Sequence, residues 1–289
     1  MKPQLPHCCV RRAFACLAGL MSVVMVHGQV ADLGFTDGTG TGSVDQYTGA
    51  TGSGWSSAWG ATFHSQTLNG LATLASSTPL VSGGGNYLRV TYDTQATVTT
   101  SAIGRVARQW DTTAISLTSP VILQFDVRLL TDSGSANQTV TFFGSSTSAS
   151  STSSNDSWKI SSSGDGWYVY SGTTAISLGT GQVKASDTWR FAVTIDAVAD
   201  TYSVATQNLT TSSIVYTSIS SLALRNGADS SLSWLNFNSS ANASLTDRGF
   251  ELDNVSVSSA IPEPGTAALL AGGAMMIGAV LRRRRQPRT

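Results

Sequence analysis

The sequence has few of the side chains that most often carry out chemistry. Its 289 residues include three cysteines, and all of them (Cys8, Cys9 and Cys16) lie near the N-terminus. Between residues 29 and 260 there is one histidine, His64, and one glutamate, Glu251. This central part therefore offers no disulfide, no thiolate metal site and no cysteine nucleophile.

These shortages disfavour several kinds of catalytic site. A Glu/Glu pair for glycoside hydrolysis is unavailable, and Glu251 is expected to point outward from its strand as a solvated residue. His64 stands without a Gly-x-Ser-x-Gly motif, which disfavours a Ser-His-Asp triad. Zinc usually needs several His or Cys ligands. We therefore expect no enzyme, and an Asp-based glycan hydrolase is the alternative.

Charge is also scarce, at 12% of residues, and it is unevenly distributed. Residues 29–260 carry nine basic against 16 acidic side chains, a net charge of −7, although the whole chain is formally neutral. Such a balance disfavours nucleic acid or anionic lipid as a partner of the folded part.

Acidic residues in one glycine-rich stretch raise the question of a bound cation. Asp37 and Asp45 lie in Gly34–Trp55 and could hold calcium, but the alternating Asp/Asn pattern and the glutamate of an EF-hand loop are missing. A turn is the favoured interpretation, and the sequence predicts no metal site and no cofactor.

The N-terminus has the order of a secretory signal peptide. Lys2, Arg11 and Arg12 precede an apolar run over 13–26, and small residues follow. We expect cleavage after Gly28, with Ala31 as the second choice, so that residues 1–28 form a signal helix and are removed. A buried core helix and a lipoprotein signal at Cys16 are the alternatives, and both fit the pattern less well.

The C-terminus pairs an apolar segment with a cationic block. Residues 265–281 are all apolar, Gly or Thr, and as a helix they would measure roughly 25 Å, just short of the roughly 30 Å hydrocarbon core. Four arginines then favour the cytoplasmic side and act as a stop-transfer signal: Arg282, Arg283, Arg284 and Arg285. The sequence predicts a transmembrane helix with the body outside, although length alone also allows a core helix.

The tail resembles the PEP-CTERM sorting domain of Gram-negative bacteria. The resemblance rests on Pro262, Glu263 and Pro264, the apolar segment and the arginine cluster, and it covers residues 261–289. It implies recognition by an exosortase after export by the secretion machinery. Cleavage near the motif would follow, with transfer from the inner membrane to the cell envelope or extracellular matrix.

Residues 29–260 show the period-two alternation of β-strands and almost no helical periodicity. In 121–129 the odd positions from Val121 to Leu129 are apolar, and Gln124, Asp126 and Arg128 lie opposite. Residues 189–195 alternate in the same way and predict a hairpin with the strand that follows. The shift of phase from Leu252 to Val255 predicts a β-bulge at 253–254.

Many short strands with Ser/Gly/Thr turns predict an all-β fold, a two-sheet antiparallel jelly-roll-like β-sandwich over 29–260. The pattern, with its closing "FELDNVSVS", resembles concanavalin A-like and carbohydrate-binding β-sandwiches. In that fold a strand near the start often pairs with the last strand. We expect a structural or adhesive protein of an extracellular polysaccharide matrix, and glycan binding is compatible with this role.

Four aromatic residues lie close together in "SWKISSSGDGWYVY" and are the candidate glycan-binding residues: Trp158, Trp167, Tyr168 and Tyr170. Aromatic faces stack on sugar rings, while Asp165 or Asn155 could bind hydroxyl groups. Trp167 and Val169 share one face of the predicted strand and the two tyrosines share the other. One of these faces is expected to belong to the core.

Overall fold

The computed structural model describes residues 30–33, 35, 54–64, 67–81, 85–95, 102–133, 138–147, 155–211, 217–226, 232–241 and 245–259. They belong to one compact unit, Gln29–Ile261. The predicted signal segment 1–28, the sorting motif, the apolar segment 265–281, the arginine cluster, and Asp37 and Asp45 lie outside the described residues. Within them, no helix is long and apolar enough to cross a membrane.

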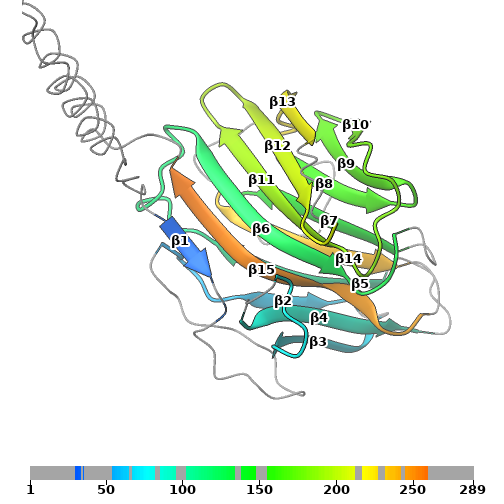
Figure 1. Ribbon diagram of the computed structural model, residues 1–289. Coiled ribbons are helices and arrows are strands. Elements are labelled where there is room, and N and C mark those ends of the chain that lie inside the picture. The colour runs from blue at the N-terminus through cyan, green and yellow to red at the C-terminus, as the bar shows by residue number, and fades with distance from the viewer. Residues whose placement is uncertain are drawn as a thin grey trace, which may run out of the picture. The chain divides into compact units, whose positions relative to one another are not determined.

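The described residues form two antiparallel sheets, which confirms the predicted all-β sandwich (Figure 1). The first sheet has eight strands. In spatial order they are β13 (Thr217–Ala223), β12 (Thr201–Asn208), β11 (Thr188–Asp196), β6 (Val121–Leu129), β15 (Arg248–Ser259), β4 (Tyr87–Thr94) and β3 (Thr67–Ala75), with β1 (Val30–Leu33) also paired to β15.

The second sheet has seven strands. In spatial order they are β10 (Thr174–Ser177), β9 (Gly166–Ser171), β8 (Trp158–Ser163), β7 (Gln138–Ser145), β14 (Trp234–Ala241), β5 (Ala102–Gln109) and β2 (Gly60–Phe63). The run from β7 to β10 is a meander of consecutive strands, whereas β14 inserts between β7 and β5. Residues far apart in the sequence therefore become neighbours on this sheet.

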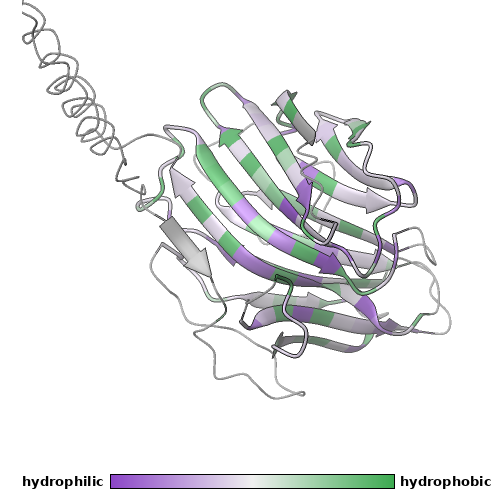
Figure 2. Ribbon diagram, in the orientation of Figure 1, coloured by the Kyte–Doolittle hydropathy of each residue, from purple (hydrophilic) through white to green (hydrophobic). Residues whose placement is uncertain are grey.

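Alternation of apolar and polar residues explains why these segments become strands with one face in the core. Val121, Leu123, Phe125 and Val127 of β6 are fully buried, as are Phe191, Val193 and Ile195 of β11. The alternation is visible as green and paler bands along β6, β11 and β15 (Figure 2). Both predicted inward sets are confirmed.

The core lies between the sheets and is rich in aromatic contacts. The ring of Phe125 from the first sheet lies 5.1 Å from that of Phe142 and 5.2 Å from that of Phe237, both from the second. Trp167 of β9 meets Phe191 of β11 edge to face, with ring centroids 5.0 Å apart. Such pairs add to the burial of apolar area that holds the sheets together.

Three features expected from the sequence are present. β11 and β12 form a hairpin in register from Trp189 opposite Asn208 to Asp196 opposite Thr201. The register of β15 against β6 shifts after Asp253, and Asn254 has a positive φ of 50°, so the bulge is confirmed. The first strand pairs with the last, β1 with β15.

Candidate functional site

Two of the four candidate glycan-binding residues lie in the core. Trp167 is fully buried, and its ring packs against Phe142 as well as Phe191. Trp158 is 1% exposed, and its indole occupies the space above Gly144, where an added Cβ would lie 2.0 Å from Nε1. Neither tryptophan can stack on a ligand, so the face that Trp167 shares with Val169 is the inner one.

The two tyrosines lie on the opposite, outward face of β9 and are partly exposed. The hydroxyl of Tyr168 donates to Asp165 Oδ2 at 2.7 Å, and Ser163 donates to Asp165 Oδ1 at 2.6 Å. These bonds lower the pKa of the Asp165 carboxyl, and the bond from Ser163 has the larger effect. The same carboxyl raises the pKa of Tyr168. Asp165 therefore holds the Tyr168 ring beside a fixed acceptor.

Tyr170 is oriented by groups from both sheets. Lys159 Nζ lies 4.9 Å from the centroid of the Tyr170 ring, and the Tyr170 hydroxyl is 3.3 Å from Ser161 Oγ. From the other sheet, the hydroxyl of Tyr202 accepts a hydrogen bond from Tyr170 N at 3.1 Å and donates to Tyr170 O. Burial raises the pKa of Tyr202 to about 12. The tyrosines thus stand on a strand whose backbone is fixed, which favours a preformed binding surface.

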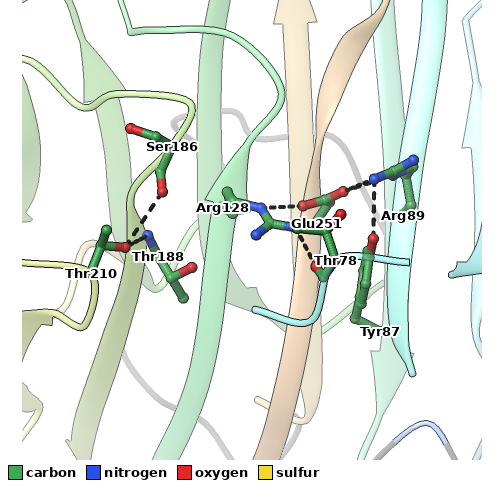
Figure 3. Close-up of polar contacts among 8 residues, drawn as sticks. All are labelled: Thr78, Tyr87, Arg89, Arg128, Ser186, Thr188, Thr210 and Glu251. Carbon is green, nitrogen blue, oxygen red and sulfur yellow. Dashed lines mark hydrogen bonds and ion pairs between the residues drawn. The ribbon is translucent and has the colours of Figure 1, made fainter. Parts of the chain in front are cut away.

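A charge network covers the outward face of the first sheet. Glu251 of β15 lies between Arg89 of β4 and Arg128 of β6, as Figure 3 shows. Arg89 Nε donates to Oε1 at 2.7 Å, and Arg128 Nε donates to Oε2. Arg128 also donates to the carbonyl of Thr78 at 2.7 Å, and Arg89 to the hydroxyl of Tyr87 at 3.1 Å.

Beside the row formed by Arg128, Glu251 and Arg89, on the side of β11, Figure 3 shows a smaller group of polar contacts. Thr210 Oγ1 accepts from Thr188 N at 2.9 Å and donates to the carbonyl of Ser186 at 3.4 Å (Figure 3). Thr188 lies opposite Arg128 in the pairing of β11 with β6. These bonds fix the start of β11 at the edge of the charge network.

The expectation that Glu251 is a solvated surface residue is wrong. The residue does point away from the core, because Phe250 and Leu252 on either side of it are buried in the core. It is nevertheless 1% exposed, since the two arginines and the chain around Thr78 cover it. A buried carboxylate is tolerated because charged donors satisfy both of its oxygens.

A second row of the same network contains two aspartates. Asp126 of β6 lies opposite Asp253 of β15 and opposite Arg190 of β11. Arg190 binds Asp126 in a bidentate manner, at 2.7 and 2.8 Å, and Asn254 Nδ2 donates to the same carboxyl at 2.7 Å. The bulge in β15 brings Asn254 to this position, so the irregular backbone serves the network.

Glycoside hydrolysis needs two carboxyl groups that face the substrate, one as acid and one as base or nucleophile. Both oxygens of Asp126 and both oxygens of Glu251 instead accept hydrogen bonds from arginine. His64 is an exposed residue at the end of β2 whose backbone N–H donates to Ile103 O. Among the residues that the structure describes, no three His, Cys, Asp or Glu side chains are grouped to hold a metal ion.

The chain matches no protein-family model and no curated protein. A carbohydrate esterase from the Shiga toxin-encoding bacteriophage phi24B is 15% identical, with a TM-score of 0.42, over 70% of this chain and 89% of its own. A Shewanella oneidensis MR-1 protein of unknown function is 13% identical, with a TM-score of 0.47, over 90% and 96%. Lectin II from Ulex europaeus is 14% identical, with a TM-score of 0.37, over 81% and 100%.

Proposed function

We propose that this protein is an exported, non-catalytic surface or matrix protein whose β-sandwich binds glycans through the outward face of the second sheet. The observation that carries the proposal is the pair Tyr168 and Tyr170, partly exposed on one face of β9 beside Asp165 and Lys159. Residues two apart on a strand are about 7 Å apart, so the two rings offer adjacent stacking positions. Asp165 accepts, and Lys159, whose ammonium group also lies 3.5 Å from Asp156 Oδ2, donates; both supply partners for sugar hydroxyls.

A non-catalytic role is supported by the state of two acidic residues at the centre of the first sheet. Arginine and asparagine donors hold Asp126 and Glu251 within the charge network. A hydrolase with an Asp-based site, the alternative from sequence, would need a carboxyl group free to act on a substrate.

We further propose that the sandwich is a concanavalin A-like jelly roll. The pairing of β1 with β15 and the insertion of β14 between β7 and β5 support this topology, because each brings strands that are far apart in the sequence together within one sheet. The proposal concerns architecture, and the binding function rests on Tyr168 and Tyr170.

The cellular route is proposed from the sequence of the two ends. A signal peptide over 1–28, the Pro262-Glu263-Pro264 motif, the apolar segment 265–281 and Arg282–Arg285 would direct export, membrane tethering and exosortase processing. Replacing the motif with three alanines should leave export intact and trap the body on the membrane. Intact masses from the envelope and medium of the native host, with and without its exosortase, measure this. Unchanged processing of the alanine variant would contradict the sorting proposal.

The glycan-binding proposal is tested by affinity electrophoresis of the full chain against soluble polysaccharides. Suitable neutral probes are β-1,3-glucan, β-1,4-mannan and β-1,4-galactan, and suitable acidic probes are polygalacturonate and alginate. We expect retardation by at least one probe and its loss in the Tyr168→Ala/Tyr170→Ala variant. Val198→Ala is the control, because Val198 is 76% exposed and lies at the β11–β12 turn. If no probe retards the wild-type protein, the proposal is refuted.

A further inference from the structure

The outward face of the second sheet carries a polar row that crosses the strands. Register pairs place Tyr168 opposite Ser161, Ser161 opposite Thr141, Thr141 opposite Asn238, and Asn238 opposite Arg105. We call these five residues the transverse row. Their strands β9, β8, β7, β14 and β5 lie side by side in that order (Figure 1). Four spacings of about 4.8 Å separate its ends, about 19 Å in all.

The middle of the row is buried and its ends are partly exposed. Ser161, Thr141 and Asn238 are 5%, 7% and 5% exposed. They nevertheless point away from the core, because Ile160, Phe142 and Phe237, their chain neighbours, belong to the core cluster. Tyr168 and Arg105 remain partly exposed at the two ends. The row therefore runs from an aromatic end over a buried polar middle to a cationic end.

Two buried polar atoms of the row have no hydrogen-bond partner among the described residues. They are the acceptor Asn238 Oδ1 and the donor Arg105 Nε, on directly opposite residues of β14 and β5. Arg105 is held at its tip, where Nη2 donates to Thr62 Oγ1 at 3.1 Å, and burial lowers its pKa. Leaving such groups unsatisfied is unfavourable, so a ligand that supplies a hydrogen-bond partner to both gains affinity.

The chemistry of the missing partner is defined by this pair of atoms. Asn238 Oδ1 needs a donor, and Arg105 Nε–H needs an acceptor. A hydroxyl group supplies both from one oxygen, whereas a carboxylate only accepts and an ammonium group only donates. The net charge of −7 over residues 29–260 also opposes a polyanion.

We propose that the transverse row is the track of an extended, uncharged polysaccharide, which stacks on Tyr168 at one end and places a hydroxyl between Asn238 and Arg105 at the other. This inference rests on the proposed glycan-binding function and adds the ligand class and the direction of the chain. Oligosaccharides too short to span about 19 Å reach one end of the row, so affinity should rise once the chain spans both ends.

The test is the isosteric variant Asn238→Asp in the full chain. The negative charge of aspartate attracts the Arg105 guanidinium group, and the ion pair that forms satisfies Arg105 Nε without a ligand. The variant should therefore be thermally more stable and yet bind the glycan at least tenfold more weakly. If Asn238 had only a structural role, its replacement would not raise the thermal stability and at the same time lower the affinity for the glycan. Gln207→Glu is the matched control, because it makes the same change opposite Arg190 on the outward face of the other sheet.

Calorimetric titration uses the neutral polysaccharide that retards the wild-type protein in electrophoresis, cut into oligosaccharides of two to eight units. We expect weaker binding of Asn238→Asp with long oligomers and equal binding with the shortest. If Asn238→Asp binds long oligomers as tightly as the wild type while the tyrosine variant does not, water fills the row and this inference fails, but the proposed function stands. Preference for polygalacturonate or alginate would also overturn it. Binding of no probe would remove both proposals.

Discussion

Replacing Glu251 with glutamine removes the negative charge that lies between Arg89 and Arg128. The glutamine amide keeps one acceptor oxygen but turns donors toward a guanidinium group, so the two arginines lose their charged partner. Glu251 is 1% exposed, and the Arg128 side chain is 13% exposed. We therefore expect the change to act as the loss of one partner from a buried ion pair rather than as a surface substitution.

The magnitude follows from burial. Removing one partner of a buried pair costs about 3–5 kcal/mol of unfolding free energy. The Arg89 side chain is 35% exposed, and water compensates part of its loss, so about 3 kcal/mol is expected. For a unit of the size of Gln29–Ile261 this lowers Tm by roughly 6–12 °C.

Thermal unfolding followed by circular dichroism measures the shift. Lys184→Ala is the control, because Lys184 and Asp132 form an ion pair at 3.1 Å whose side chains are 50% and 36% exposed, worth at most about 1 kcal/mol. An apolar triple variant, Arg89→Met/Arg128→Met/Glu251→Leu, should recover at least half of the loss, since no unpaired charge remains. If Glu251→Gln shifts Tm no more than Lys184→Ala, the reasoning about burial is refuted.

Three further measurements test the burial, hydrogen bonding and packing of particular residues. Tyr202→Phe should lose about 1–3 kcal/mol in urea unfolding, because the N–H and C=O of Tyr170 lose a buried partner. Burial raises the pKa values of Tyr92 and Tyr202 to about 12, so the folded state keeps protons that the unfolded state loses. Stability should then fall as pH rises from about 10 to 12, and a tyrosine absorbance titration should show two late ionisations. Gly249→Ala should cost more than about 4 kcal/mol, because φ is 138° and an added Cβ would lie 1.8 Å from Val90 O. Gly172→Ala, with a positive φ but open space, should cost about 1 kcal/mol, and equal losses for the two variants would contradict the steric argument.

The sequence predicted which face each strand residue occupies, because period two is a property of the strand itself. The sequence did not predict which side chains cover the outward face of the first sheet. Glu251 alternates outward as expected, but its partners Arg89 and Arg128 lie 162 and 123 residues away in the chain. Alternation carries no information about such partners, so a buried ion-pair network looked like a solvated surface.

Strand order explains the other gap between sequence and structure. The pattern of β9 offered two aromatic faces and could not select the inner one, which packing against Phe142 and Phe191 decides. The transverse row was not predicted at all, since Arg105 and Asn238 become neighbours only through the pairing of β5 with β14. Arginine and asparagine are common in strands with period-two alternation, so neither Arg105 nor Asn238 indicates a binding site by itself.

The long strand β15 has a mechanical consequence. It lies in the interior of the first sheet, with β6 along one side and β4 followed by β1 along the other. A pull applied beyond Ser259 acts along the strand axis, so the hydrogen bonds to both neighbours are sheared together instead of opening one after another. By contrast, a pull that separates Val30 from its partner Ser258 peels β1 away one pair at a time. A protein held from the C-terminal side of this unit would therefore resist tension from a bound ligand far better than tension applied at its first strand.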